Sequence, residues 1–293
     1  PSVTFPDGLV SLREFSFASC SSLSKLNISK VTTIERNSFE YCTSITEIIF
    51  CDDLKGISEY AFQHCYSLPK LNFPQDFTTI HQFAFSHCRG IKEINFNEKL
   101  AIINKYAFEH CTSLPYLTFN SAVTICDHCF QYCTTLDNID FNETKQIGDY
   151  AFLGCSKIGN LTLGEYILYT NSNGRAISVG NYAFQFCTGI HTINVPENIT
   201  SDMFGVGVFY GCTGLTGPTQ FPEHFTSVPP AYYSHCTRLG QLNITENITS
   251  IGYEAFCNCT SLGPACNIPT TVKYIGNRAF YNCASLIVHM NYH

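Results

Sequence analysis

Residues 57–73 of this chain contain one complete copy of a repeated sequence: Ile57-Ser58-Glu59-Tyr60-Ala61-Phe62-Gln63-His64-Cys65-Tyr66-Ser67-Leu68-Pro69-Lys70-Leu71-Asn72-Phe73. The pattern Ile-x-x-x-Ala-Phe-x-x-Cys-x-x-Leu-x-x-Leu-x-Phe recurs along the chain, and one cysteine marks each copy. These are Cys20, Cys42, Cys65, Cys88, Cys111, Cys133, Cys155, Cys187, Cys212, Cys236, Cys259 and Cys283. A period of about 23 residues over almost the whole chain is typical of a solenoid, in which each repeat contacts only its neighbours.

Each copy has two parts with different periodicity. Leu71-Asn72-Phe73 alternates apolar and polar residues, which predicts a strand, and Pro74 ends it because proline has no ladder donor. From Ile57 to Cys65 the apolar spacing is typical of one helical or 3₁₀ turn. We therefore expect one strand and one short helical return per copy, with successive strands forming a parallel sheet.

The composition agrees with a repeat protein and limits the possible partners. Hydrophobic residues make up 45% of the chain, enough for a continuous core, while charged residues make up 13%. The net charge is −7 and lysine and arginine do not cluster, so nucleic acid is not an expected partner. No apolar run is long enough to cross a membrane, so we expect no membrane insertion.

The marker cysteines are expected to form a buried column of free thiols. Free cysteine packs as a small hydrophobic residue, and side chains in a parallel ladder point the same way, which is poor geometry for a disulfide. The structural column predicted here includes Cys42, Cys65, Cys88, Cys111, Cys133 and Cys155.

Copies such as Ile147-Gly148-Asp149-Tyr150-Ala151-Phe152-Leu153-Gly154-Cys155-Ser156-Lys157-Ile158 resemble the treponema-type, or BspA-like, leucine-rich repeats. The resemblance implies a β-rich leucine-rich-repeat solenoid of the α/β type, with a parallel concave sheet, short 3₁₀ or helical returns and a right-handed superhelix. It also implies bacterial or protozoan cell-surface proteins that take part in adhesion. We expect a single domain over residues 1–293, with about twelve repeats and an insertion at 164–178. Because the chain opens inside a repeat, we expect it to derive from a longer protein.

The insertion is the largest departure from the period. Two β-prone arms surround Asn171-Ser172-Asn173-Gly174, and Asn-Gly favours the positive φ of hairpin turns, so a protruding hairpin is predicted. An irregular loop is the alternative. Insertions in solenoids often project from the binding face, which makes Tyr166, Tyr169 and Arg175 candidate contact residues.

The middle residue of each strand is expected to face solvent on the concave sheet. This column is polar and almost uncharged, and with one flanking tyrosine it gives the candidate binding residues Asn72, Asn95, Tyr116, Thr118, Asp140, Thr162 and Asn194. The alternative is an amide ladder in which these side chains satisfy one another. Two residues earlier, Lys25, Glu47, Lys70 and Glu93 alternate in sign, which predicts structural pairs between strands.

Two further columns fall in the returns. Tyr60, Phe83, Tyr106, His128, Tyr150 and Tyr182 are expected to be half-buried packing, with an exposed interface patch as the alternative. His64, His87 and His110 share another place, which we interpret as solvated turn surface. A metal site is the alternative, but no fourth ligand is evident, so neither metal nor cofactor is expected.

The sequence contains no motif that indicates catalysis. Cys126-Asp127-His128-Cys129 resembles a CxxC, but the second CxxC of a structural zinc site is missing, so we interpret it as a core substitution. Phosphate loops, nucleophile elbows and His-Glu-x-x-His are absent from the sequence.

We therefore expect a non-catalytic recognition or adhesion module at the cell surface or secreted, not an enzyme. Its partner would be a protein or glycan of another cell or matrix. An intracellular scaffold in the cytoplasm is the alternative, since reduced cysteine is normal there. End-to-end self-association is a further possibility, because uncapped solenoid ends expose apolar rungs.

Overall fold

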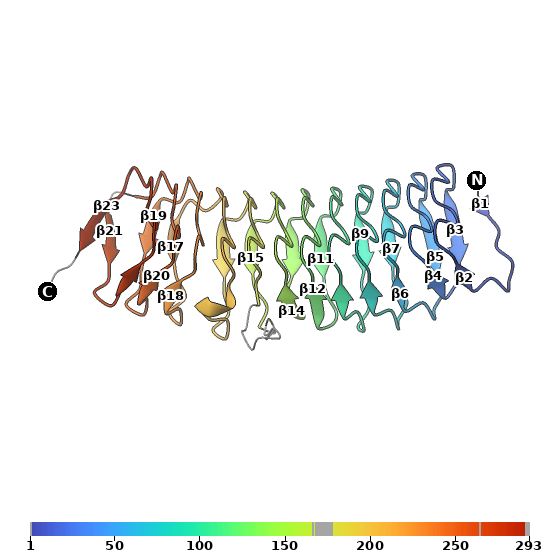
Figure 1. The fold of residues 1–293 in the computed structure, drawn as a ribbon, viewed down its shortest axis with the longest axis horizontal. Coiled ribbons are helices and arrows are strands. Elements are labelled where there is room, and N and C mark those ends of the chain that lie inside the picture. Colours follow the sequence, from blue (N-terminus) through green and yellow to red (C-terminus); the bar gives the residue numbers. More distant parts are fainter. Residues whose placement is uncertain (1, 166, 168–177, 264, 291–293) are drawn as a thin grey trace. The chain divides into compact units, whose positions relative to one another are not determined.

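A computed structural model of the chain describes residues 2–165, 167, 178–263 and 265–290 (Figure 1). The chain folds as a parallel-strand β-solenoid, which confirms the predicted fold class. It forms two compact units, Pro1–Lys145 and Gln146–His293, which are described one at a time. The single domain expected over 1–293 stays a prediction. The described residues include no helix long and apolar enough to cross a bilayer.

The first unit has two rows of parallel strands (Figure 1). The row of longer strands, one per rung, consists of β1 (Ser2–Val3), β3 (Lys25–Ile28), β5 (Glu47–Phe50), β7 (Lys70–Asn72), β9 (Glu93–Asn95), β11 (Tyr116–Thr118) and β13 (Asn138–Asp140). The register matches equivalent residues of successive repeats, such as Leu71 with Ile94 and Asn72 with Asn95. The strand column predicted from the repeat is thus confirmed.

A second row of short strands was not predicted. It is formed by β2 (Ser11–Leu12), β4 (Thr33–Ile34), β6 (Gly56–Ile57), β8 (Thr79–Ile80), β10 (Ile102–Ile103) and β12 (Val123–Ile125). The strand β14 (Thr144–Ile147) contains the boundary between the units. Each short strand ends on the aliphatic residue that opens the repeat, which is Leu12 in β2 and isoleucine in the others, and these residues are buried. Their burial explains why an apolar residue recurs there in every copy.

The second unit repeats this plan. Its longer strands are β15 (Asn160–Thr162), β16 (Thr192–Asn194), β17 (Pro218–Gln220), β19 (Gln241–Asn243), β21 (Ala265–Ile268) and β23 (Ile287–Met290). Its short strands are β18 (Ser227–Val228), β20 (Ser250–Ile251) and β22 (Tyr274–Ile275). A 3₁₀ helix, η1 (Ser201–Met203), precedes Phe204. The hairpin predicted within 164–178 falls mostly outside the described residues.

The returns differ from the helical segments that we expected. In the third copy, Ala61 N–H donates to Ser58 O, Gln63 N–H to Tyr60 O and Cys65 N–H to Phe62 O, so the return is a run of tight turns. Tyr60 and His64 have φ of +58° and +62°. A positive φ at the third turn residue is the type II geometry that normally selects glycine. The apolar spacing that suggested a helix comes from these turns.

The turns are also bonded from rung to rung. The N–H groups of Tyr60, Phe62 and His64 donate to carbonyls of the next turn at 3.1, 2.8 and 3.0 Å. Alternate residues therefore bond within the turn and between turns, which satisfies the buried backbone.

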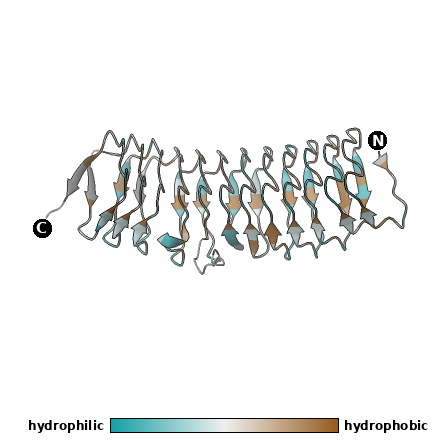
Figure 2. Ribbon diagram, in the orientation of Figure 1, coloured by the Kyte–Doolittle hydropathy of each residue, from teal (hydrophilic) through white to brown (hydrophobic). Residues whose placement is uncertain are grey.

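The core of the first unit is a column of phenylalanines from these turns. Phe39, Phe62, Phe85, Phe108 and Phe130 are fully buried, and successive rings are stacked with centroids 5.1–5.4 Å apart. Figure 2 shows apolar residues at the same level of successive strands. Inward strand residues such as Phe50 contact this column, and the ring centroid of Phe50 lies 6.0 Å from that of Phe62. Burying each ring contributes about 1.5–3 kcal/mol, so the stack accounts for much of the driving force for folding.

Candidate functional site

The candidate binding face of the first unit consists of the solvent-facing side chains of β3, β5, β7, β9, β11 and β13, called here the long-strand face. Alternation along each strand turns one residue inward and the next outward. Leu71, Ile94 and Leu117 are accordingly buried. The predicted residues Asn72, Asn95, Tyr116, Thr118 and Asp140 are all exposed on this face.

Two of the asparagines on this face are bonded to each other. Asn95 Nδ2 donates to Asn72 Oδ1 at 2.7 Å and lies 3.1 Å from Glu93 Oε1. Asp140 Oδ1 accepts from the backbone N–H of Asn142 at 2.9 Å. This part of the face therefore has the amide-ladder character that was the alternative to a binding platform, and both roles can coexist because each amide has further donors and acceptors.

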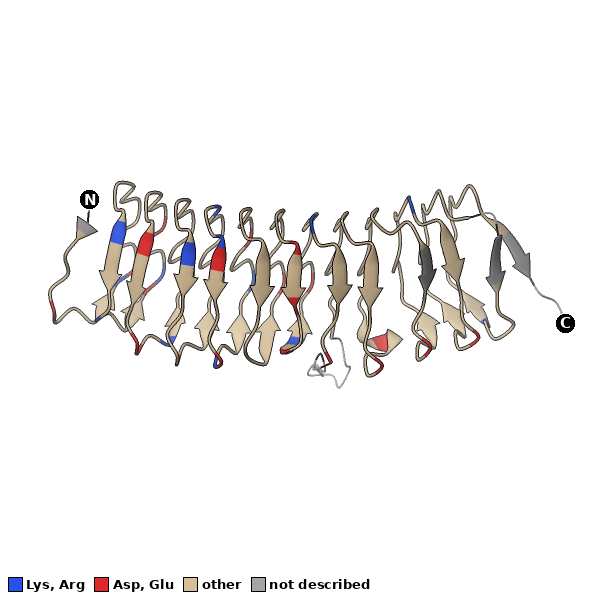
Figure 3. Cartoon of the chain, turned by 180° about the vertical axis from the view of Figure 1, so that it is seen from behind, with Lys and Arg blue, Asp and Glu red and all other residues tan. Residues whose placement is uncertain are grey.

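The charged column beside the asparagines forms ion pairs across strands. Lys25 Nζ lies 3.1 Å from Glu47 Oε2, and Lys70 Nζ lies 2.6 Å from Glu93 Oε1. Figure 3 shows these charges alternating along β3, β5, β7 and β9. The hydrogen bond from Lys70, followed by that from Asn95, lowers the pKa of Glu93. The predicted structural pairing is confirmed, and it leaves the charged half of the face internally neutralised.

Two large side chains interrupt the polar surface. Tyr116 on β11 is 44% exposed, and Ile49 on β5 is 46% exposed. Tyrosine is enriched among residues that dominate binding energy, because it offers a large rigid surface with a polar end. Ile49 was not among the predicted contact residues. Its signal was present in the sequence, since it is the apolar member of an otherwise polar column.

In the second unit the corresponding side chains are neutral. Thr162 and Asn194 are exposed, and Asn194 Nδ2 donates to Thr162 Oγ1 at 3.1 Å. Thr192 Oγ1 donates to Asn160 Oδ1 at 2.5 Å. The other predicted contact residues, Tyr166, Tyr169 and Arg175, lie outside the described residues.

The marker cysteines line the inside of the turns. Cys42, Cys65, Cys88, Cys111, Cys133 and Cys155 are buried and do not form disulfides. Several thiols donate to the phenylalanine carbonyl of the preceding rung, for example Cys88 Sγ to Phe62 O at 3.0 Å. Burial raises the pKa of Cys133 to about 12. The Cys133 thiol is therefore protonated and unreactive at neutral pH.

The CxxC-like segment belongs to the same interior. Cys129 takes the alanine place of the repeat and is fully buried, while Cys126 is half-buried. Burial, followed by the charge of Asp127, raises the pKa of Cys126 to about 11.

Two ladders of rings run along the turns at the left-handed positions. The first turn ladder contains Tyr60, Phe83, Tyr106 and His128, whose centroids are 4.6–4.8 Å apart. These rings are half-buried and stacked, as the packing interpretation expected. The second turn ladder contains Tyr41, His64, His87, His110 and Tyr132, with spacings of 4.3–4.8 Å.

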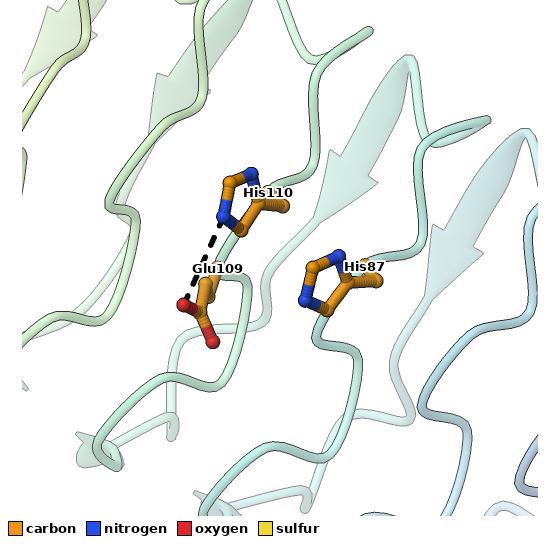
Figure 4. Close-up of side chains that lie close together, drawn as sticks. All are labelled: His87, Glu109 and His110. Atoms are coloured by element: carbon orange, nitrogen blue, oxygen red, sulfur yellow. Dashed lines mark ion pairs between the residues drawn. The ribbon is translucent and has the colours of Figure 1, made fainter.

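The second turn ladder brings together a set of metal-ligating groups. One donor atom each of His87, Glu109 and His110 lies within 4.8 Å of the other two (Figure 4). Glu109 was not recognised from the sequence. In the sequence it is marked only by its position directly before His110. It joins the cluster because the neighbouring turn brings His87 close to it.

Comparison with known proteins identifies the repeat. The sequence matches the BspA type leucine rich repeat region in six copies, over residues 1–80, 55–174 and 166–287. A search of curated proteins gave no significant match.

Solved structures share the fold at low sequence identity. A leucine-rich repeat protein from Bacteroides ovatus is 22% identical over 97% of this chain and 84% of its own, with a TM-score of 0.74. The pneumococcal vaccine antigen PcpA is 17% identical over 99% of this chain and 88% of its own, with a TM-score of 0.51.

Proposed function

The chain belongs to the BspA-type leucine-rich repeat family, and from this premise we propose that it is a recognition module that binds a protein through its long-strand face. Leucine-rich repeats of this family imply protein binding, and repeat solenoids present extended surfaces for it. The proposed role is non-catalytic. The partner belongs to another cell or to a matrix, and a glycan is a second class to be tested.

The observation that supports this proposal most directly is the surroundings of Tyr116. Its ring projects from β11 between the ion-paired strands β7 and β9 on one side and β13, which carries Asp140, on the other. Neighbouring Thr118 and Asp140 offer hydrogen-bonding groups without a cluster of like charge. An aromatic anchor with a polar rim is the usual anatomy of a protein interface.

We further propose that the partner lies outside the cell. A protein described as a vaccine antigen has the same fold. The intracellular scaffold remains the second candidate, because the described marker cysteines are free thiols. Surface biotinylation of intact cells, with a cytosolic protein as control, separates the two: labelling of the protein supports the first, and labelling only after lysis supports the second.

Binding should be tested with the full chain against panels of immobilised extracellular proteins and glycans. For a ligand so found, Tyr116→Ala is expected to weaken binding by about 2 kcal/mol, roughly 30-fold. Tyr132→Ala is the matched control, since Tyr132 is similarly exposed but lies in a turn. Equal losses in the two variants, or an effect of Tyr132→Ala alone, would contradict the proposed face.

A further inference from the structure

The second turn ladder contains a cluster of donor atoms whose chemistry differs from the rest of the surface. His87 and His110 occupy the same place in consecutive turns, and their rings are stacked with centroids 4.6 Å apart and planes 12° apart. Figure 4 shows the carboxylate of Glu109 on the side where one nitrogen of each ring is presented. His110 Nε2 lies 4.0 Å from Glu109 Oε1.

We propose that His87, Glu109 and His110 bind one divalent transition-metal ion, and that Zn²⁺ is a suitable ion for this set of ligands. Two imidazoles and one carboxylate form a donor set that zinc, nickel and copper accept. Calcium and magnesium prefer oxygen ligands alone, so they are not expected to compete.

The carboxylate is held in place by neutral groups. Gln131 Nε2 donates to Glu109 Oε1, and Ser86 Oγ lies 3.4 Å from Oε2. Gln131 is itself bonded to His128 Nδ1 at 2.8 Å. The Glu109 side chain is only 15% exposed. Such contacts orient a metal ligand without neutralising its charge. A nearby cation stabilises the charge of a half-buried carboxylate.

The imidazoles are also suited to coordination. His87 Nδ1 is buried and has no hydrogen-bond partner among the described residues, so no such bond fixes the tautomer of this ring. Both rings are half-buried in the turn ladder. Neutral imidazole is the form that binds metal.

The donor atoms must move closer together when the ion binds. Bonds of about 2.1 Å in a tetrahedral site place ligand atoms roughly 3.4 Å apart, whereas the present separations reach 4.8 Å. Rotation of the three half-buried side chains can supply this change. Three protein ligands leave a fourth position for water or for a donor group of a partner.

One feature that opposes binding is Arg89. It follows His87 by two residues and carries a positive charge, which repels a divalent ion. The guanidinium is directed over the ring of Tyr66, with its carbon 5.7 Å from the centroid. Arg89→Gln is therefore expected to tighten binding of the ion severalfold.

Calorimetric titration of the reduced full chain with zinc chloride at pH 7.5 tests the site. One equivalent of zinc is expected to bind, and His87→Gln, His110→Gln and Glu109→Gln are each expected to weaken it at least tenfold. The matched control is His235→Gln. His235 occupies the same turn position in the second unit, where its ring stacks on Tyr210 at 4.4 Å and Asn258 Nδ2 lies 2.8 Å from its Nε2.

A second readout separates this site from the cysteines. Cobalt(II) bound by imidazole and carboxylate gives weak d–d bands without thiolate charge transfer. Strong charge-transfer absorption, or zinc affinity that is unchanged in all three variants, would overturn the proposal. Glu109→Gln removes only a charge, so it keeps the test decisive if a histidine variant fails to fold, as judged by circular dichroism.

Discussion

The two units follow the same backbone path but fill it with different side chains. In the first unit both left-handed positions of each turn carry non-glycine residues, and from Tyr41 to Tyr132 the second position is always an aromatic ring or a histidine. In the second unit Gly154, Gly207 and Gly211 appear at these positions with φ of +62° to +71°. A left-handed non-glycine residue costs on the order of 1 kcal/mol, so ring stacking in the first unit has to offset that strain.

The glycines of the second unit make room for a different ring arrangement. A Cβ at Gly207 would lie 2.3 Å from Tyr182 Cε1, and one at Gly211 would lie 2.4 Å from Phe186 Cδ1. Tyr210, between these glycines in sequence, meets both rings edge-on, with centroids 6.1 and 5.6 Å away. Between Tyr210 and the rings of Tyr182 and Phe186, T-shaped contacts thus take the place of the parallel stacking seen in the first unit.

The interior differs as well. At the alanine place of the tenth copy the second unit has Tyr232, which is fully buried. Its ring meets Phe204 and Phe209 at right angles, with centroids 5.5 and 5.1 Å away. The repeat therefore sets one backbone conformation for both units, whereas the aromatic rings that pack against this backbone differ from rung to rung.

The largest expected effect comes from making the second unit more like the first. Tyr232→Ala restores the residue found at Ala61, Ala84 and Ala107, yet it should destabilise the chain by about 3–5 kcal/mol, because Phe204 and Phe209 are packed around the larger ring. Urea unfolding followed by circular dichroism measures the change. Unchanged stability would show that the side chains are interchangeable and would remove the distinction between the units.

The next effect tests the room that glycine provides. Gly211→Ala should destabilise by roughly 1–3 kcal/mol, since its φ of +69° and the contact with Phe186 both oppose a Cβ. Gly217→Ala is the control, because nothing lies within 4 Å of the added carbon. If the two variants unfold at the same urea concentration, steric exclusion at Gly211 is not important.

A pair of glycine substitutions tests whether stacking offsets the strain. Tyr106→Gly removes one ring, which stacks on Phe83 and on His128 with centroids 4.6 Å away in each case. The substitution should lower the free energy of unfolding by about 1–2 kcal/mol, although it relieves the strain of the positive φ. Arg278, exposed in the second unit with φ of +56°, would lose a 3.7 Å ion pair with Glu254 and a cation–π contact at 5.8 Å from the Tyr281 centroid, both at the surface. Arg278→Gly should be neutral or stabilising by up to about 1 kcal/mol. The same sign for both changes would contradict the argument.

The smallest effect concerns the charges on the first unit. Hydrogen bonds from Lys99 and then Lys55 lower the pKa of Asp76 to about 2. The folded pKa lies below the ordinary value of 3.8, so this contact favours the folded state above that value and is lost as the pH falls towards 2. Lys99→Met should raise the Asp76 pKa, as followed by carboxyl-carbon NMR, and Lys30→Met should leave it unchanged.

Much of the fold follows from the sequence, because the repeat supplies the same signal many times. The inward strand residues Leu71 and Ile94 and the Lys70–Glu93 pair occur in the predicted register. The turn conformation could not be predicted, since its usual marker is glycine or asparagine and here Tyr60 and His64 stand in those places. The short strands were missed for a related reason. Two residues such as Thr79-Ile80 form no period, and their pairing becomes visible only when rungs are stacked.

The candidate sites were predictable to different degrees. Strand alternation was enough to predict that Asn72, Asn95 and Thr118 are exposed, because this prediction needs only local geometry. Which of these contacts a partner depends on the partner, so their role stays a prediction. Glu109 lies beyond such reasoning, since its place beside His87 depends on two successive turns and on the anchoring contact with Gln131.

The bonds between turns have an electrostatic consequence. From Phe39 N–H to Ala61 O, from Phe62 N–H to Ala84 O and from Phe85 N–H to Ala107 O, the donor always belongs to the earlier turn. Aligned peptide dipoles add, as they do in an α-helix. The peptide dipoles of the turn column in the first unit therefore point with their positive ends towards higher residue numbers, opposite to the sense of an α-helix, whereas the bonds beside the short strands, such as His81 N–H to Ile57 O, run the other way.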